Sequence, residues 1–264
     1  MVILSAIRKD DTQTVATKKI KAVSYYLDYL STVRILNGKE NTYDNIRDLM
    51  FDVAKQVRDL NLVDLKQVLE SLISQERDQL DAMRSVSYQD AKRQDLLHLL
   101  ARVATELEDS LELSTKVGFQ NYVDRTRDSK TFDIEHLLTS SFADVNADLG
   151  KANKSPFASQ STFEKQRDMI GGLILLPRGR NRSMKDMVYS EKLSRYSNEN
   201  VLAQTLTESF FLNQPNWTKF SAESRISCDP ILRVDETALT QRAEFYFLIA
   251  KRIWDKEQLK KAFI

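Results

Sequence analysis

Glycine and proline are distributed very unevenly along this chain of 264 residues. The first 149 residues contain no proline and only two glycines, Gly38 and Gly118. All four prolines and the other four glycines lie between Gly150 and Pro230. Because long stretches without helix-breaking residues favour α-helix, the sequence predicts a helical first half and places strands after Gly118.

Apolar residues in the first half recur at steps of three and four, which puts them on one face of a helix. These stripes lie at residues 23–33, 46–60, 65–73 and 96–111. Residues 15–115 are therefore expected to form a helical bundle of about four helices. Another stripe, from Leu239 to Trp254, predicts a helix near the end of the chain with Asp235 as its N-cap.

The pattern changes after Gly118. Residues 131–138, "TFDIEHLL", are compatible with a short strand, and "GGLILLP" at 171–177 is an apolar run between glycines and a proline, typical of a second strand. The polar stretch 146–160 between them is expected to be irregular. The spacing of apolar residues behind Pro177 predicts one helix over 181–196.

Composition narrows the class of protein. Hydrophobic residues make up 42% and charged residues 29%, the balance of a soluble globular protein, and no apolar run is long enough for a membrane span. The single cysteine, Cys228, excludes an internal disulfide and suits a reducing cytoplasm. The net charge of +1 means that any surface for nucleic acid must be local.

His136 is one of only two histidines and follows Asp133 and Glu135 directly. In a strand, Asp133 and Glu135 would share one face and His136 would point to the other. Carboxylates can bind a hard cation such as Mg²⁺, and a neutral imidazole can act as a general base. The alternative is a buried structural histidine between solvated acids. His98, on a strongly apolar helical stripe, is interpreted as structural.

A basic segment follows the second expected strand. "LPRGRNRSMK" carries Arg178, Arg180, Arg182 and Lys185 around Asn181, without an acidic residue. Arginines beside the start of a helix suit phosphate oxygens, and the amide oxygen of Asn181 could complete a metal's coordination shell. The alternative is a solvated basic turn in which Asn181 is simply a helix cap.

Taken together, "IEHLLT", "GGLILLPRGRN" and "LTQRAEFYFLIAKRIWD" resemble the HNH nucleases, also called the ββα-metal or His-Me finger fold. The resemblance is to the nuclease part of GmrSD-like modification-dependent restriction and phage-defence enzymes. It implies a mostly α fold with a small embedded ββα-metal motif, around which a helical bundle and a C-terminal helix pack. Residues 1–118 would form the helical bundle region and 119–264 the nuclease region.

The resemblance also implies roles for individual residues. His136 and Asn181 would be catalytic, with His136 deprotonating the attacking water. Glu135 and Asn181, with Asp133 as a further candidate, would hold one divalent ion, expected to be Mg²⁺ with Mn²⁺ as a substitute. DNA phosphates would meet the basic residues of the segment that follows the second strand. These are Arg178, Arg180, Arg182 and Lys185.

The implied function is metal-dependent endonuclease cleavage of DNA in the bacterial cytoplasm, in defence against phage or modified DNA. Relatives carry an N-terminal NTPase and modification-sensing domain, so the chain is expected to be a C-terminal part of a longer protein. Two departures from the family pattern leave an alternative open, a helical interaction module with a decayed nuclease motif. Thr139 replaces a proline and Gly172 replaces the middle asparagine. RNA as substrate is a third possibility.

Overall fold

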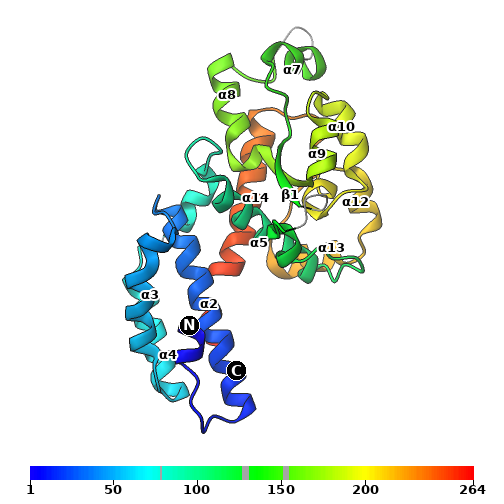
Figure 1. Cartoon of the computed structure of the whole chain (residues 1–264). Helices are drawn as coiled ribbons and strands as arrows, with labels where there is room; N and C mark the ends of the chain where they lie inside the picture. Colours follow the sequence, from blue (N-terminus) through cyan, green and yellow to red (C-terminus); the bar gives the residue numbers. More distant parts are fainter. Residues whose placement is uncertain (78, 127–130, 151–154) are drawn as a thin grey trace. The chain divides into compact units, whose positions relative to one another are not determined.

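The computed structural model describes residues 1–77, 79–126, 131–150 and 155–264. These residues are mostly helical, and their one sheet has two antiparallel strands (Figure 1). The expectation of a mostly α fold with a small embedded strand motif is thus confirmed. The chain divides into two compact units, Met1–Ala82 with Lys251–Ile264, and Met83–Ala250.

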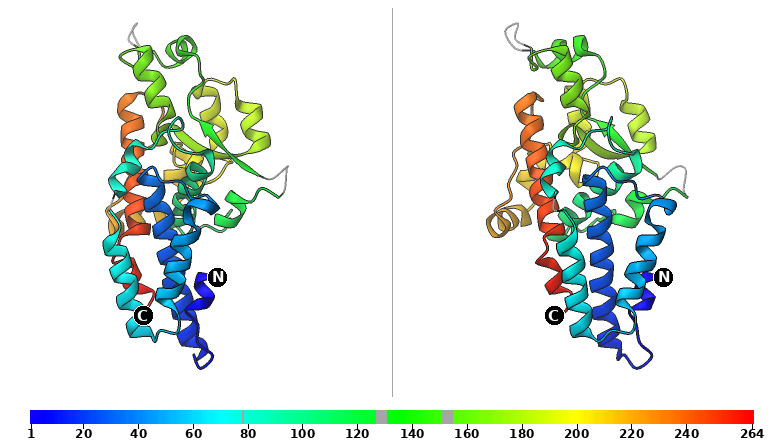
Figure 2. Two further views of the ribbon diagram at one scale, coloured as in Figure 1. Left: turned by 60° about the vertical axis from the view of Figure 1, so that its left-hand side comes forward. Right: turned by 90° about the vertical axis from the view of Figure 1, so that its left-hand side faces the viewer.

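The first unit is built from helices α1 (Val2–Ser5), α2 (Gln13–Leu36), α3 (Tyr43–Val57) and α4 (Leu62–Gln75), together with α15 (Gln258–Lys261) near the C-terminus. Helices α2, α3 and α4 lie side by side in each view (Figure 2). Their predicted stripes are buried, including Val53, Val57, Leu65 and Leu69. Burial of these apolar side chains stabilises helices that would be marginal alone.

The second unit contains the two strands and shorter helices. Its elements, after η1 (Leu80–Ser85) at the boundary, are α5 (Arg93–Ser110), α6 (Phe119–Val123), β1 (Phe132–His136), α7 (Phe142–Leu149), α8 (Gln160–Asp168), η2 (Ile170–Gly172), β2 (Leu173–Pro177), α9 (Arg178–Met184), α10 (Tyr189–Tyr196), α11 (Val201–Gln204), α12 (Glu208–Asn213), α13 (Asn216–Ser224) and α14 (Glu236–Trp254). Both strands and the C-terminal helix form where the sequence predicts them. Asp235 caps α14 as expected, since its Oδ1 accepts a hydrogen bond from Ala238 N at 3.0 Å.

Two expectations about local structure need correction. Residues 155–159 are irregular as expected, but the ends of the stretch 146–160 belong to α7 and α8, which Ser141 and Ser159 cap with their side chains. Residues 151–154 lie outside the described residues. The single helix expected over 181–196 is two helices. The first begins at Arg178, so Asn181 lies inside α9 rather than at its start. A new N-terminus forms at Val188, whose backbone N–H donates to Glu191 Oε2 at 3.2 Å.

Strands β1 and β2 pair in a register that sets which backbone groups point outward. Leu137 N donates to Gly172 O at 2.9 Å and Arg178 N donates to Thr131 O at 2.8 Å, so these are hydrogen-bonded pairs at either end of the ribbon. Along an antiparallel ladder, residue pairs that exchange backbone hydrogen bonds alternate with pairs that do not. The pairs Ile134 with Leu175 and His136 with Leu173 therefore turn their carbonyl groups away from the partner strand.

The backbone at Gly171 and Gly172 packs too closely against its neighbours for any side chain. A Cβ atom on Gly172 would lie 2.4 Å from the carbonyl oxygen of Arg167, and one on Gly171 would lie 2.1 Å from that of Leu239. Both obstacles are backbone atoms of helices, which cannot move aside as a flexible side chain can. Glycine at these positions is thus a packing requirement of η2, the short turn that leads into β2.

We expect Gly172→Ala to lower the free energy of unfolding by about 1–3 kcal/mol, because the added methyl overpacks the contact with α8. Urea denaturation measures the change. Gly179→Ala in α9 is the matched control, since nothing lies within 4 Å of a Cβ there. That control should be neutral or stabilising by up to about 1 kcal/mol. Equal destabilisation by both substitutions would contradict the close-packing account.

Candidate functional site

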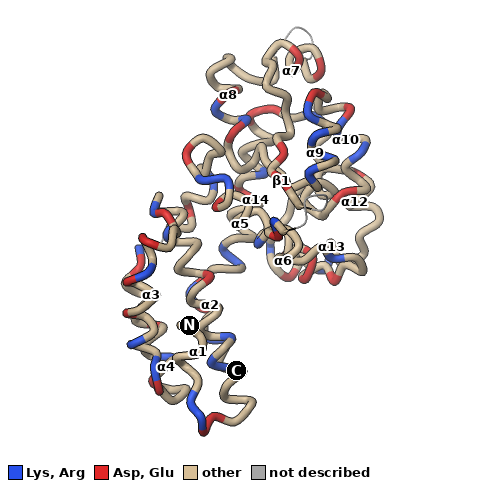
Figure 3. The backbone as a smooth tube through the Cα atoms, in the orientation of Figure 1, with Lys and Arg blue, Asp and Glu red and all other residues tan. Residues whose placement is uncertain are grey.

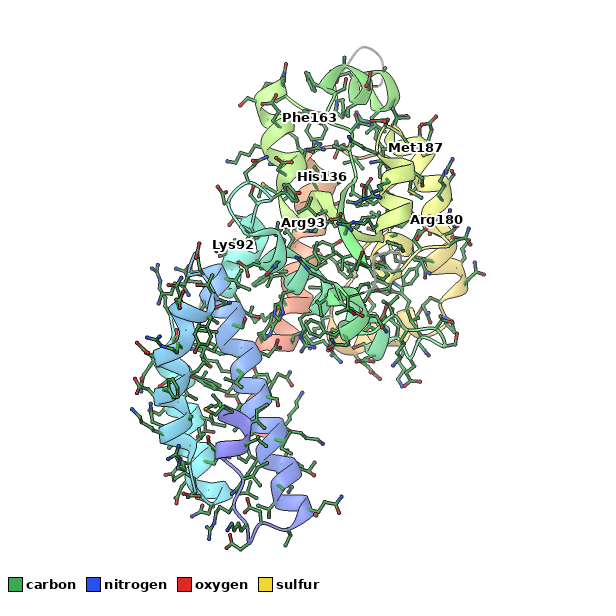
Figure 4. The ribbon with its side chains drawn as sticks, in the orientation of Figure 1. Lys92, Arg93, His136, Phe163, Arg180 and Met187 are labelled. Atoms are coloured by element: carbon green, nitrogen blue, oxygen red, sulfur yellow. The ribbon has the colours of Figure 1, made fainter. Side chains whose placement is uncertain are left out.

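His136 ends strand β1 and is largely enclosed by other parts of the second unit (Figure 4). Its side chain is 15% exposed, and its Nε2 lies 2.9 Å from Oδ1 of Asp168, at the end of α8. The two atoms are in contact without the alignment of a regular hydrogen bond. The ring of Tyr88 packs edge-on against the imidazole at 4.9 Å between centroids. The pair of His136 and Asp168 is the centre of the candidate site.

Asp168 is held from two directions. Its Oδ1 accepts from Arg167 Nη1 at 2.9 Å, and its Oδ2 accepts from the Gln89 amide. Arg167 Nε also donates to the carbonyl oxygens of Leu138 and Thr139, at 3.1 and 2.9 Å. One guanidinium therefore joins the carboxylate beside His136 to the segment that follows His136.

The environment of His136 favours its neutral form. Burial lowers the pKa of His136 to about 4, and the positive charge of Arg167 acts in the same direction, against the opposing effect of Asp168. A histidine in this state is unprotonated at neutral pH and can accept a proton. The negative charge of Asp168 beside Nε2 favours the tautomer that carries hydrogen on Nε2, which leaves Nδ1 as the accepting atom.

Glu135 faces away from His136 and is buried at 5% exposure. Its Oε1 accepts from the ammonium group of Lys192 on α10, with 2.5 Å between Oε1 and Nζ. Lys192 is itself 1% exposed and also donates to the carbonyl oxygen of His136 at 2.9 Å. Burial raises the pKa of Glu135, and Lys192 opposes this by stabilising the carboxylate.

Asp133 and Asn181 are also bound to neighbours. Asp133 Oδ1 accepts from Arg93 Nε at 3.0 Å, from Arg93 Nη2 and from the backbone N–H of Ile134 at 2.7 Å. The amide nitrogen of Asn181 donates to the carbonyl oxygen of Ile134 at 3.0 Å. The structure thus brings His136, Glu135, Asp133 and Asn181 around one strand, with Asn181 and Lys192 closing its outer edge.

A metal ion held by Glu135, Asp133 and Asn181 does not fit this arrangement of side chains. Oxygen donors are chemically suitable for Mg²⁺. However, Lys192 binds the first carboxylate and Arg93 binds the second. Across the described residues, no group of three or more His, Cys, Asp or Glu side chains is placed to hold an ion. The metal ligand set therefore stays a prediction.

The basic residues predicted to meet DNA lie on or next to α9, where Figure 3 shows a group of Lys and Arg. Arg180, Arg182 and Lys185 are exposed and Arg178 is half-buried. Arg180 Nε lies 3.3 Å from a carboxylate oxygen of Glu199, beside a hollow of about 210 Å³. This segment can offer positive charge to phosphates next to the strand that carries His136.

A larger hollow of about 540 Å³ opens beside Asp168. Residues of the segment before α5 and of α8 line it, among them Ser87, Gln89 and Lys165. Gln89 and Asp168 contact each other at its wall, and Asp168 in turn contacts the imidazole of His136. The hollow gives solvent a route toward this side of the site.

The site includes residues that the sequence does not single out. Asp168, Arg167 and Gln89 lie far from His136 in the chain and carry no motif of their own. Lys192 sits in a segment recognisable only as helical. These partners reach the site because α8 and α10 fold onto β1. A spacing rule within one segment cannot predict such contacts.

The candidate site is thus a pair of strands with a histidine at the end of the first and a basic helix after the second. The family model described as GmrSD restriction endonucleases, C-terminal domain, matches residues 73–226, more than half of the chain. The chain belongs to this family. Its place among restriction endonucleases indicates a nuclease role with DNA as substrate. No curated protein and no protein of known structure matches the chain.

The matched region begins within α4 and ends just after α13, so it contains β1, β2 and all the site residues described above. No helix among the described residues is long and apolar enough to cross a membrane. The predicted motif therefore lies inside the matched region.

We expect NMR titration to find one imidazole with a pKa near 4, and the signal should be absent in His136→Gln. Asp168→Asn should lower this pKa further, because it removes the charge that favours protonation. The pKa of His136 in the folded state lies below the unfolded value of about 6.5. The contribution of this residue to the free energy of unfolding should therefore be fully present above about pH 6.5 and be lost as the pH falls toward 4. A pKa of 6 or above would contradict the buried neutral imidazole.

Proposed function

We propose that this chain is an HNH-type DNA endonuclease in which His136 is the general base. The proposal is supported above all by the neutral, enclosed imidazole of His136, backed by Asp168 at the end of β1. A general base must be unprotonated at working pH. His136 meets this condition, and exposed basic residues of α9 follow directly on the neighbouring strand.

In this reaction His136 Nδ1 removes a proton from a water molecule, and the water oxygen attacks the scissile phosphorus. The bond between phosphorus and the 3′ oxygen breaks, and the 3′ oxygen takes a proton from solvent. The products are a 5′-phosphate and a 3′-hydroxyl. Asp168 stabilises the protonated imidazole that forms during the attack. Arg167 holds both Asp168 and the carbonyl groups of the following segment, so the base keeps its position.

The proposal includes dependence on one divalent ion, Mg²⁺, with Mn²⁺ as a substitute. Such an ion would supply positive charge to the phosphate as a Lewis acid. Binding of an ion by Glu135 or Asp133 would require Lys192 or Arg93 to release its carboxylate first. The biological setting we propose is defence against phage or modified DNA in the bacterial cytoplasm, with an N-terminal NTPase and sensing domain as partner.

Plasmid cleavage at low salt with Mg²⁺ or Mn²⁺ tests the base. We expect supercoiled DNA to become nicked or linear, and His136→Ala to reduce the rate by about 10²- to 10⁴-fold. EDTA should stop the reaction and added Mg²⁺ should restore it. His98→Gln, at the other histidine of the chain, is the matched control and should retain cleavage.

Cleavage that survives His136→Ala would reject this site. A chain that cleaves neither DNA nor RNA would favour the alternative function, a helical interaction module with an inactive nuclease motif. That alternative was opened by the departures at Thr139 and Gly172, and the pairing of Glu135 with Lys192 and of Asp133 with Arg93 is the structural observation that favours it. Cleavage of RNA in preference to DNA would keep the base and change the substrate.

The role of the basic segment gives a separate prediction. Arg182→Gln and Lys185→Gln should each raise KM for DNA while leaving kcat unchanged, because phosphate contacts position DNA without taking part in the reaction. The slope of log affinity against log salt should become shallower by about 0.9 for each phosphate that the variant no longer neutralises. Lys219→Gln, at an exposed lysine on α13, is the control and should leave both quantities unchanged. If KM and the salt slope are unchanged in Arg182→Gln and Lys185→Gln, DNA binds to another surface of the protein.

A further inference from the structure

The carboxylate of Glu135 is paired within the protein, unlike a carboxylate that is free to bind a metal ion. Its carboxylate is buried, and its nearest charge is the ammonium group of Lys192, 2.5 Å away. Both side chains are almost completely enclosed, so water screens their attraction poorly. Removing either charge alone would leave the other buried without compensation, which is strongly unfavourable. The two residues are therefore a fixed pair in this structure.

Lys192 makes a second contact that links this pair to the base. Its ammonium group donates to the carbonyl oxygen of His136 at 2.9 Å. That carbonyl points outward from the strand pair, because His136 and Leu173 form a pair without mutual hydrogen bonds. Lys192 thus satisfies a backbone group at the end of β1, where a free carbonyl would otherwise leave the strand end loose.

The geometry assigns Lys192 a positioning role: its ammonium is the fixed cation that binds Glu135 and holds the backbone of His136, so that Glu135 orients the base and does not bind a metal ion. Because Glu135 and His136 alternate along β1, their side chains occupy opposite faces. The inference rests on the proposed function, since it concerns how the proposed base is held. It gives Lys192 a role in the site, and it gives Glu135 a role that differs from the one implied by the family resemblance.

The two roles for Glu135 predict opposite results for Lys192→Met. If Glu135 is the counterion of Lys192, this variant frees the end of β1, and kcat should fall by about 10- to 100-fold while KM for DNA is unchanged. The NMR signals of the His136 ring should shift as well. If Glu135 is a metal ligand, Lys192→Met removes a competing cation, and both Mn²⁺ affinity and cleavage should increase.

Glu135→Gln provides a complementary test, because glutamine retains an oxygen that can accept from Lys192. We expect kcat to fall, because the buried ammonium group of Lys192 then lacks its counter-charge, and the Mn²⁺ dissociation constant to stay within about twofold, measured by electron paramagnetic resonance. A Mn²⁺ affinity at least about tenfold weaker would overturn the inference. Lys116→Met is the control for Lys192→Met, since Lys116 also forms an ion pair in this unit but is exposed.

The decisive comparison does not depend on activity. Mn²⁺ is titrated into the full chain that retains Lys192, with and without Glu135→Gln. Binding that is present in the original chain and disappears in Glu135→Gln would identify Glu135 as a ligand and overturn the inference. Equal binding, or none in either protein, would support it. A chain that fails to cleave DNA would refute the proposed function, whereas the Mn²⁺ and NMR results would still decide the role of Lys192.

Discussion

The structure of the site depends on how a ribbon of two strands is kept from fraying at its edges. Two strands alone are marginal in water, and each has an outer row of unpaired backbone groups. Here side chains from four other segments bind the outward carbonyl groups. Asn181 and Lys192 bind those of Ile134 and His136 on β1, whereas Tyr246 and Asn200 bind those of Leu173 and Leu175 on β2. The position of the histidine is therefore set by helices α9, α10 and α14 as much as by the ribbon.

Charge is arranged around this ribbon so that each acid meets a cation. Arg93 binds Asp133, Lys192 binds Glu135, and Arg167 binds Asp168 next to the imidazole. Because Arg167 already compensates Asp168, that carboxylate supports the imidazole without charging it in the resting state. Burial and Arg167 together outweigh Asp168, which is why the pKa of His136 is low rather than high. This balance keeps the imidazole neutral in the resting state and places beside it a carboxylate that can stabilise the imidazolium formed when a proton is taken up.

Much of the fold follows from patterns within single segments. The long helices were predictable because their apolar residues repeat at helical spacing without glycine or proline, and β1 and β2 because short apolar runs lie between breakers. The break between α9 and α10 was not, since it depends on a local cap made by Glu191. For the site, the sequence identifies His136 and the basic residues near it. It could not identify Asp168 or Lys192 as their partners, because the residues in each pair are far apart in the chain.

The departure at Gly172 has a physical explanation that bears on whether the site is intact. Where the family pattern has an asparagine, the backbone of this chain passes so close to Arg167 that no side chain fits. The same close approach brings the end of α8 against β1, and with it Asp168, whose carboxylate lies 2.9 Å from the imidazole of His136. The missing side chain at position 172 and the carboxylate supplied from position 168 are thus two results of one packing arrangement. The absence of a side chain at position 172 therefore follows from how α8 packs in this chain, and by itself it is not a sign of a decayed site.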